Sequence, residues 1–520
     1  MKRLFKEKTF CYLFHIFGIA MFAILFYYCL GGTGINSTEL ADEHIYFKSD
    51  SLLSNAALIC LALLALCFVG RLSDKLKSKK ARNTVLLVIC ILTAAVSFYW
   101  VFGSKSAPQA DQMFLCQYAD EFNRGDFHEL SKGGYMARYP QQLGMVTLLR
   151  LLFAVFGEGF YPAFQYLVAA MVPLLVLSGC QIVRLLSEES TRAEIFYYLF
   201  VLFCFPMYAY TTFVYGDLIS TILGFFGVWM YLSCLKKFSP IRLFLFGLSI
   251  GFAVELRKNM LILVIALAIV TLIKLLFDRR LKTLSLLAAL ITGCSILHLA
   301  VLGLYHNAAG EGEPGVNAPA IPALLFIVMG LNDDNGFTGW HNGYEYLTFD
   351  ELDDNVAMAK EKARQDLQLY LDIYKKDPDY MIDFFVRKMN AQWNAPMYQS
   401  LAMNDYVKED QLPVIKEIYA QGALTRLLSL GMKLYQLLMY GGILYLLARH
   451  GRDNVRLEKY LLLIAVFGGF LFSLMWEAKT RYILPYFLMQ IPMMAMGLDE
   501  LTTRLLETCH SFFRNKKFTP

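Results

Sequence analysis

Long apolar stretches recur along most of the chain, and short polar connectors separate them. A stretch of about 17 to 25 apolar residues can cross the roughly 30 Å hydrocarbon layer of a membrane as a single helix, with its backbone groups hydrogen bonded internally. The pattern therefore predicts an all-α, polytopic transmembrane protein with about twelve full crossings. The expected spans are 10–30, 52–70, 84–103, 161–183, 194–212, 215–235, 241–256, 260–277, 283–304, 424–447, 459–475 and 482–498.

One long polar stretch, over about 305–424, interrupts this rhythm. It divides the chain into an N-terminal transmembrane module (1–304), an extracytoplasmic insertion (305–423) and C-terminal helices with a tail (424–520). Within the insertion, Thr348 or Asp350 could cap a first helix, and the proline after Asp377 predicts a break before a second helix over 378–389. We expect a small, mainly helical cap on the outer face.

Composition and charge support this topology. The chain is 57% hydrophobic and only 18% charged, which is too apolar for one soluble core. Basic residues cluster in the N-terminal leader and in connectors such as 71–82 and 278–282, and such loops stay in the cytoplasm. Both termini are therefore predicted to be cytoplasmic, with the 104–142 loop, the 208–217 connector and the insertion outside. The insertion carries 19 acidic and 9 basic residues while the whole chain is +5, so the charge reflects topology rather than nucleic-acid binding.

The segment 141–156 is apolar but does not fit as a full crossing. Counting it as one would move the later basic connectors to the outer side and break the charge rule. Arg150 in its middle also argues against a lipid-exposed span. We expect this segment to be re-entrant or half-buried.

The 104–142 loop holds the best candidate for a catalytic group. Asp111 follows an apolar span, at a depth where a carboxylate can take a proton from an acceptor hydroxyl beside a lipid-linked donor. Asp120 and Glu121 are alternative acids, because an amphipathic helix over 118–127 could present either of them to the same site. The competing interpretation of Asp111 is a solvated loop acid.

Cations on the outer side suggest a site for a phosphate group. Arg481, oriented by Glu477, could bind a phosphate with its planar set of donors. The alternative is an interfacial belt in which cations extend toward water at a helix end. The candidates for binding the donor phosphate are Arg138, Tyr139, Arg481, Tyr482, Arg257 and Lys258.

Residues 329–344 are rich in turn formers and in groups that can bind sugar hydroxyls. Trp340 offers a flat apolar face and Asn342 offers paired donors and acceptors, although a glycine-rich surface loop would have the same composition. His341 and His128 could equally be solvated histidines, and Asp217 could simply cap a helix. The candidates for binding the sugar or the acceptor are Gln112, Gln141, Asp217, Trp340, Asn342 and Glu477.

The cysteines give no sign of a metal centre or a disulfide framework. Most of the 11 lie in or beside apolar spans, without a CxxC pair or a histidine spacing typical of zinc. We predict no metal site and no cofactor, without excluding a divalent metal.

Several of these segments together resemble the GT-C superfamily of membrane glycosyltransferases. They are Asp111 shortly after a span, the 117–127 stretch, Tyr139-Pro140-Gln141-Gln142-Leu143-Gly144, and the late Glu477-Ala478-Lys479-Thr480-Arg481-Tyr482 with Pro485. That superfamily includes protein O-mannosyltransferases and lipid A aminoarabinose transferases. The segments 329–331 and 339–342 also resemble an outer loop of its cell-envelope branch in Gram-positive bacteria.

The resemblance implies an enzyme of the bacterial plasma membrane that transfers a sugar on the outer face. The donor would be a polyprenyl-phosphate sugar, the acceptor a glycan, lipid or protein, and Asp111 the general base of an inverting reaction. A lipid-linked oligosaccharide flippase or transporter is one alternative, but it should have charges deep within its spans and repeat symmetry. A polysaccharide polymerase or ligase is another, and it would rely on outer arginines and a histidine.

Overall fold

The computed structural model describes residues 2–516 apart from 37–44, 77, 279–280, 307, 309–317, 335–336, 403–404, 407–409 and 451–455. Each predicted span contains helix, and the chain is an all-α polytopic membrane protein, as predicted. These helices are α1 (Lys2–Gly31), α2 (Leu52–Ser73), α3 (Lys79–Ser104), α7 (Phe160–Leu186), α8 (Thr191–Leu202), α10 (Gly216–Lys236), α11 (Pro240–Leu256), α12 (Leu261–Asp278), α13 (Leu281–Tyr305), α19 (Ala423–His450), α20 (Leu461–Met475) and α21 (Leu484–Lys516).

Within the described residues, 9 helical stretches are long and apolar enough to cross a membrane, or 10 if one bent pair forms a single span. This number is below the predicted twelve for three local reasons. Helix α11 has only 17 residues, α21 is interrupted by polar residues, and the predicted span over 194–212 is broken. Helices α8 and α9 (Phe205–Ala209) meet at 52°, because Pro206 lacks the N–H that would continue the helix.

The segment that we expected to be re-entrant or half-buried contains α6 (Leu143–Phe156). At 1.5 Å per residue its 14 residues extend about 21 Å, less than the hydrocarbon thickness. Gly157 then takes a φ of 55° and starts the turn η3 (Gly157–Gly159) that leads into α7. The Arg150 guanidinium donates to the Phe122 carbonyl oxygen of α4 (Asp111–Asn123) at 3.2 Å, so this cation is bound by protein.

The insertion forms the expected helical cap. Its described helices are α14 (Ala323–Gly330), α15 (Tyr344–Glu351), α16 (Val356–Lys376), α17 (Pro378–Trp393) and α18 (Pro413–Tyr419). The predicted break at Asp377 is confirmed, since its carboxylate accepts from the Tyr380 N–H and caps α17. The predicted first cap is wrong. Thr348 and Asp350 lie inside α15, and Asn355 caps α16 because the chain turns after α15.

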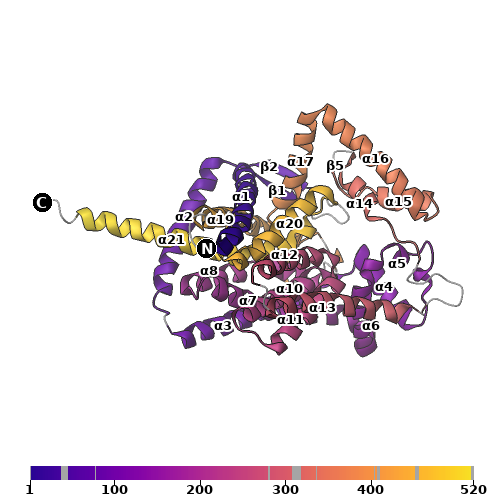
Figure 1. Cartoon of the computed structure of the whole chain (residues 1–520), viewed down its shortest axis with the longest axis horizontal. Helices are drawn as coiled ribbons and strands as arrows, with labels where there is room; N and C mark the ends of the chain where they lie inside the picture. Colours follow the sequence, from indigo (N-terminus) through magenta and orange to yellow (C-terminus); the bar gives the residue numbers. More distant parts are fainter. Residues whose placement is uncertain are drawn as a thin grey trace.

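The cap lies at one end of the molecule and the C-terminus at the other, with α4 and α5 (Tyr135–Arg138) beside the cap (Figure 1). The described strands form three short antiparallel pairs. Strand β1 (Gly32–Asn36) pairs with β2 (Ile45–Ser49), and β4 (Asp333–Asp334) pairs with the neighbouring β5 (Phe337–Thr338). The third pair connects distant segments, because β3 (Ser106–Ala107) in the 104–142 loop lies against β6 (Asp405–Tyr406) in the insertion.

Helix α17 anchors the cap in the membrane bundle. Trp393 at its end is fully buried, and its indole N–H donates to the Ser473 hydroxyl of α20 at 2.9 Å. The ring also stacks on Tyr486 of α21. Trp393 thus packs in the protein core. The cap is therefore attached to the last two spans through buried contacts.

Candidate active site

A cavity of about 1260 Å³ opens where the polar stretches outside the spans converge. Its walls come from the 104–142 loop, the connector before α10, the turn between α11 and α12, the cap, and the connector between α20 and α21. This volume exceeds the 300–1,000 Å³ that is usual for a single small ligand. The cavity therefore has room for two reacting groups.

Asp111 stands at one side of this cavity as the first residue of α4. Its two carboxylate oxygens accept from the hydroxyls of Tyr135 at 3.5 Å and Tyr215 at 3.4 Å. Ala110, just before it, has φ 48° and ψ −132°, a strained combination for a residue with a β-carbon. Asp111 is thus held in position while 42% of its side chain remains exposed.

Arg481 lies next to Asp111, with 4.0 Å between its Nη2 and the Asp111 Oδ2. Its side chain is only 6% exposed, and its guanidinium faces the rings of Phe213, Tyr215 and Tyr482 at 5.1, 5.0 and 5.3 Å. Its backbone N–H is fixed by the Gln399 side chain. Because the guanidinium is held mainly by ring faces, its N–H donors can turn to an anion in the cavity.

Arg257 and Lys258 extend the cationic wall. The Arg257 guanidinium lies over the rings of Tyr215 and Tyr482 at 4.7 and 5.2 Å. Gly216 permits this approach, because a β-carbon there would lie 1.9 Å from the Leu256 carbonyl oxygen. The Lys258 amine donates to Glu255 at 2.7 Å. Two arginines and a lysine thus share one side of the cavity with Asp111.

Asp217 does not line the cavity, contrary to its predicted role in binding sugar. It is fully buried behind the wall, where its carboxylate lies 3.0 Å from Arg257 Nε. A buried carboxylate compensates the charge of a neighbouring buried guanidinium and holds that guanidinium in place. Asp217 therefore positions Arg257.

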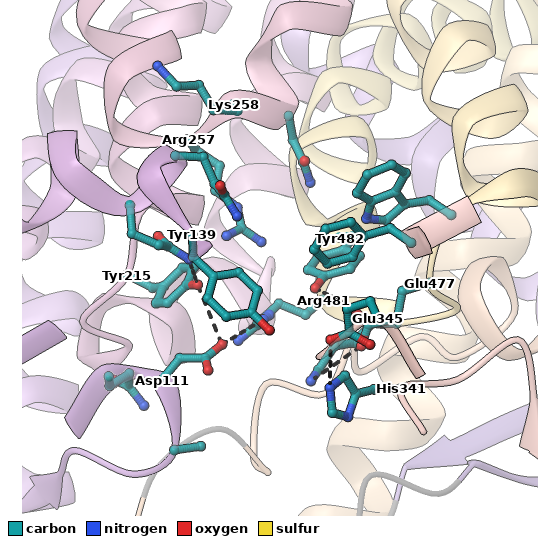
Figure 2. Close-up of a pocket in the computed structure, with 18 of the residues that line it drawn as sticks. Asp111, Tyr139, Tyr215, Arg257, Lys258, His341, Glu345, Glu477, Arg481 and Tyr482 are labelled. Carbon is teal, nitrogen blue, oxygen red and sulfur yellow. Dashed lines mark hydrogen bonds and ion pairs between the residues drawn. The ribbon is translucent and has the colours of Figure 1, made fainter. Parts of the chain in front are cut away.

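A second charged group lies across the cavity from Asp111 (Figure 2). His341 Nε2 is 3.2 Å from the Glu345 carboxylate, and the Tyr482 hydroxyl donates to Glu477 at 2.6 Å. The hydrogen bond to Glu345 raises the pKa of His341 to about 9, so this imidazole is charged at neutral pH. Glu477 also lies 3.8 Å from Lys479. We had expected Glu477 to orient Arg481. Among the described contacts it orients Tyr482 instead.

Four other predicted residues lie outside the cavity wall. Arg138 is buried and donates to Asp350 and Asp354 of the cap at 2.7 and 3.0 Å, so its charge is used to hold the cap. Within the described part of the chain, the other three make their polar contacts with near neighbours. Asp120 pairs with Arg124, Glu121 accepts from Gln117, and Asn342 accepts from the Tyr344 N–H.

Ten of the predicted residues do line the cavity: Asp111, Gln112, Tyr139, Gln141, Arg257, Lys258, Trp340, Glu477, Arg481 and Tyr482. Gln112 also accepts from the Val214 N–H at 2.7 Å and joins α4 to the connector before α10. Several lining residues were not among the predicted site residues, including Tyr135, Tyr215, Glu345 and Lys479. A phenol hydroxyl or a second acid becomes informative only when its distant partner is known.

No group of three His, Cys, Asp or Glu side chains suited to a metal ion occurs among the residues that the structure describes. The cavity wall holds three such carboxylates, Asp111, Glu345 and Glu477, distributed over both sides. The expectation of a site without a metal remains a prediction.

Comparisons with known proteins place the chain in a family. The structure of the Archaeoglobus fulgidus oligosaccharyltransferase tethered with an acceptor peptide containing the NVT sequon is similar at 12% identity and a TM-score of 0.40, over 84% of this chain and 51% of that one. This chain thus spans about half the length of that protein. No curated protein matches the sequence. A family profile described as "Conserved hypothetical integral membrane protein" matches residues 5–499, so the chain belongs to this family of integral membrane proteins.

Proposed function

We propose that this protein is a membrane glycosyltransferase of the GT-C type. It would move a sugar from a polyprenyl-phosphate donor to an extracytoplasmic acceptor. The observation that carries the proposal is the pairing of Asp111 with the buried Arg481, 4.0 Å apart in a large cavity outside the spans. A base beside an anion-binding arginine is the minimum that such a transfer requires.

The reaction follows from the charges on each side. The acceptor oxygen forms a bond to the anomeric carbon of the donor sugar, and the bond from that carbon to the phosphate oxygen breaks. The acceptor proton goes to the Asp111 carboxylate, while the bonding electron pair leaves with the phosphate. Attack from the face opposite the phosphate inverts the anomeric carbon.

The cationic wall would bind the leaving phosphate. Arg481, Arg257 and Lys258 all line the cavity, and the two guanidiniums provide planar sets of N–H donors. A phosphate is already a good leaving group, so neutralisation of its charge replaces a general acid. We propose no cofactor. The hydroxyls of Tyr135 and Tyr215 hold Asp111 toward the incoming acceptor.

The proposed location is the bacterial plasma membrane, with the cavity on the outer face and both termini in the cytoplasm. The basic connectors support this orientation through the charge rule. The C-terminal end of α21 also lies on the side of the molecule opposite the cap and α4 (Figure 1). The polyprenyl tail of the donor would stay in the bilayer while its sugar phosphate enters the cavity.

The test is sugar transfer by the purified protein in vesicles, from a panel of polyprenyl-phosphate sugars to membrane extracts. Asp111→Asn should reduce transfer by about 10²- to 10⁴-fold, the usual contribution of a general base. Asp120→Asn is the matched control, because Asp120 lies on the same helix but outside the cavity wall. Undiminished transfer by Asp111→Asn would overturn the assignment of the base. Movement of an intact sugar-lipid across the bilayer without transfer would instead support a flippase.

A further inference from the structure

The cavity wall opposite Asp111 carries a charged cluster that the proposed chemistry does not use. We call its members His341, Glu345, Glu477 and Lys479 the acceptor subsite. His341 and Glu345 come from the cap, while Glu477 and Lys479 come from the connector between α20 and α21. Figure 2 shows His341, Glu345 and Glu477 facing Asp111 and Tyr215 across the cavity.

Glu345 is the strongest indication of a ligand. Its side chain is 2% exposed yet lines the cavity, and its Oε2 has no hydrogen bond of normal geometry within the described part of the chain, although the Tyr139 hydroxyl lies close to this carboxylate. A buried carboxylate oxygen without a donor is costly, and a hydroxyl donated by a ligand would remove that cost. Glu345 Oε1 is already used by His341, so the second oxygen is the one available to a ligand.

The charges of the subsite favour a neutral ligand. Two carboxylates, Glu345 and Glu477, are matched by Lys479 and by His341, whose pKa of about 9 keeps it charged at neutral pH. An anionic polymer would leave the subsite with an excess of negative charge, and a cationic peptide would leave it with an excess of positive charge. A neutral polyol satisfies both signs, because each hydroxyl donates to a carboxylate and accepts from a cation.

The shape and apolar surface favour a sugar over a peptide. Trp340 and Phe326 line the same region, and aromatic groups can contact the apolar C–H faces of a sugar ring. An extended peptide would be expected to pair with a strand edge. The described strands next to cavity-lining segments are two residues each, and they already pair with one another, β3 with β6 and β4 with β5.

Tyr139 connects the subsite to the proposed base. Burial raises its pKa above the usual value, and the nearby negative charges of Glu345 and Asp111 raise it further. Figure 2 shows the Tyr139 ring on the side of Asp111 that faces Glu345. A ligand bound by Glu345 would therefore lie beside Tyr139 and within reach of Asp111.

We propose that the acceptor of this enzyme is a neutral glycan, and that Glu345 in the acceptor subsite selects it by accepting one of its hydroxyls. This inference rests on the proposed function, because only a transferase has an acceptor. Its binding prediction stands separately, because a neutral glycan can bind in this cavity without any donor.

The test measures binding to the full-length protein in detergent by saturation-transfer NMR, without donor. The probes are neutral oligosaccharides of hexoses, a Ser/Thr-rich peptide and a glycerol phosphate oligomer. We expect a neutral oligosaccharide to bind, and Glu345→Gln to weaken it about 10- to 100-fold, as for a lost hydrogen bond to a charged group. Glu351→Gln, an exposed acid on the same helix α15, should leave binding unchanged.

Because Glu345 is buried, His341→Gln provides a second variant whose side chain is half-exposed and whose loss should also weaken binding. Preferential binding of the peptide or of the glycerol phosphate oligomer would overturn the inference, as would unchanged oligosaccharide binding in both variants. A separate titration of the wild type with polyprenyl-phosphate sugars tests the proposed function. If the polyprenyl-phosphate sugars do not bind while the oligosaccharide does, the proposed transferase function is wrong and the glycan-binding site stands.

Discussion

The Tyr215 hydroxyl donates to the Asp111 carboxylate at 3.4 Å while the ring of the same residue lies against the guanidiniums of Arg257 and Arg481. One side chain thus connects the proposed base with both arginines. Gln142 in turn donates to the Tyr215 hydroxyl and fixes its direction. The base and the phosphate-binding wall therefore have a common support.

This relationship predicts a selective defect for Tyr215→Phe. The ring and its contacts with the arginines remain, but the hydroxyl that orients Asp111 is lost. We expect kcat to fall about fivefold, since a long hydrogen bond contributes about 1 kcal/mol, while KM for the donor stays near the wild-type value. Tyr215→Leu, which also removes the ring, should raise that KM. Equal changes in kcat and KM for both variants would contradict this division of roles.

Arg481 should be sensitive even to a change that keeps its charge. Arg481→Lys replaces the planar donor set with a compact ammonium that stacks poorly on Phe213 and Tyr482. We expect donor KM to rise about tenfold in Arg481→Lys, and kcat/KM to fall about 100-fold or more in Arg481→Gln. Arg124→Gln is the control, because Arg124 is exposed and pairs only locally with Asp120. Wild-type kinetics in Arg481→Gln would exclude Arg481 from the donor site.

Arg138 should affect stability rather than donor binding. Removing its charge leaves the buried Asp354 without compensation, which usually costs about 3 to 5 kcal/mol. Arg138→Gln should therefore loosen the cap and make α15 and α16 sensitive to limited proteolysis, while donor KM changes little at low temperature. Adding Asp354→Asn should restore part of the resistance. A large rise in donor KM with an intact cap would show that Arg138 binds the donor phosphate, as its sequence context had suggested.

The pair of His341 and Glu345 predicts a pH dependence of stability. The hydrogen bond raises the pKa of His341 from 6.5 to about 9 in the folded protein. A raised pKa means that the stabilisation is complete below about 6.5 and is lost as the pH rises through 9. The Tm difference between the wild type and His341→Gln should thus be largest near pH 6 and shrink toward pH 10. A difference that grows with pH would show that the imidazole is not charged in the folded state.

The sequence was sufficient for the spans because their signal is local. Apolar length located the helices of most predicted spans, although α1 and α21 extend well beyond theirs, and Asp377-Pro378 located a break in the cap. The bend after α8 was missed, since Pro206 lies within an apolar run that continues through it. Hydropathy measures residue type and does not detect the loss of a single backbone donor.

The candidate site was only partly predictable because its contacts are long-range. Motifs selected Asp111 and Arg481 separately, but their proximity depends on the packing of the first outer loop against the last connector. Arg138 shows the limit clearly. Its partner Asp354 lies 216 residues away, and an unpaired arginine in a sequence looks the same whether it will bind a ligand or an aspartate.

The connector before α21 also determines when the cavity becomes complete during biosynthesis. The Thr480 hydroxyl donates to the Ala391 carbonyl and the Ala478 N–H to the Gly339 carbonyl, so this late segment seals the cap onto the bundle. Asp111 is synthesised well before Arg481. A nascent chain, or one truncated before Arg481, therefore carries the proposed base without this cation, and the cavity lacks one wall until the connector between α20 and α21 has been made.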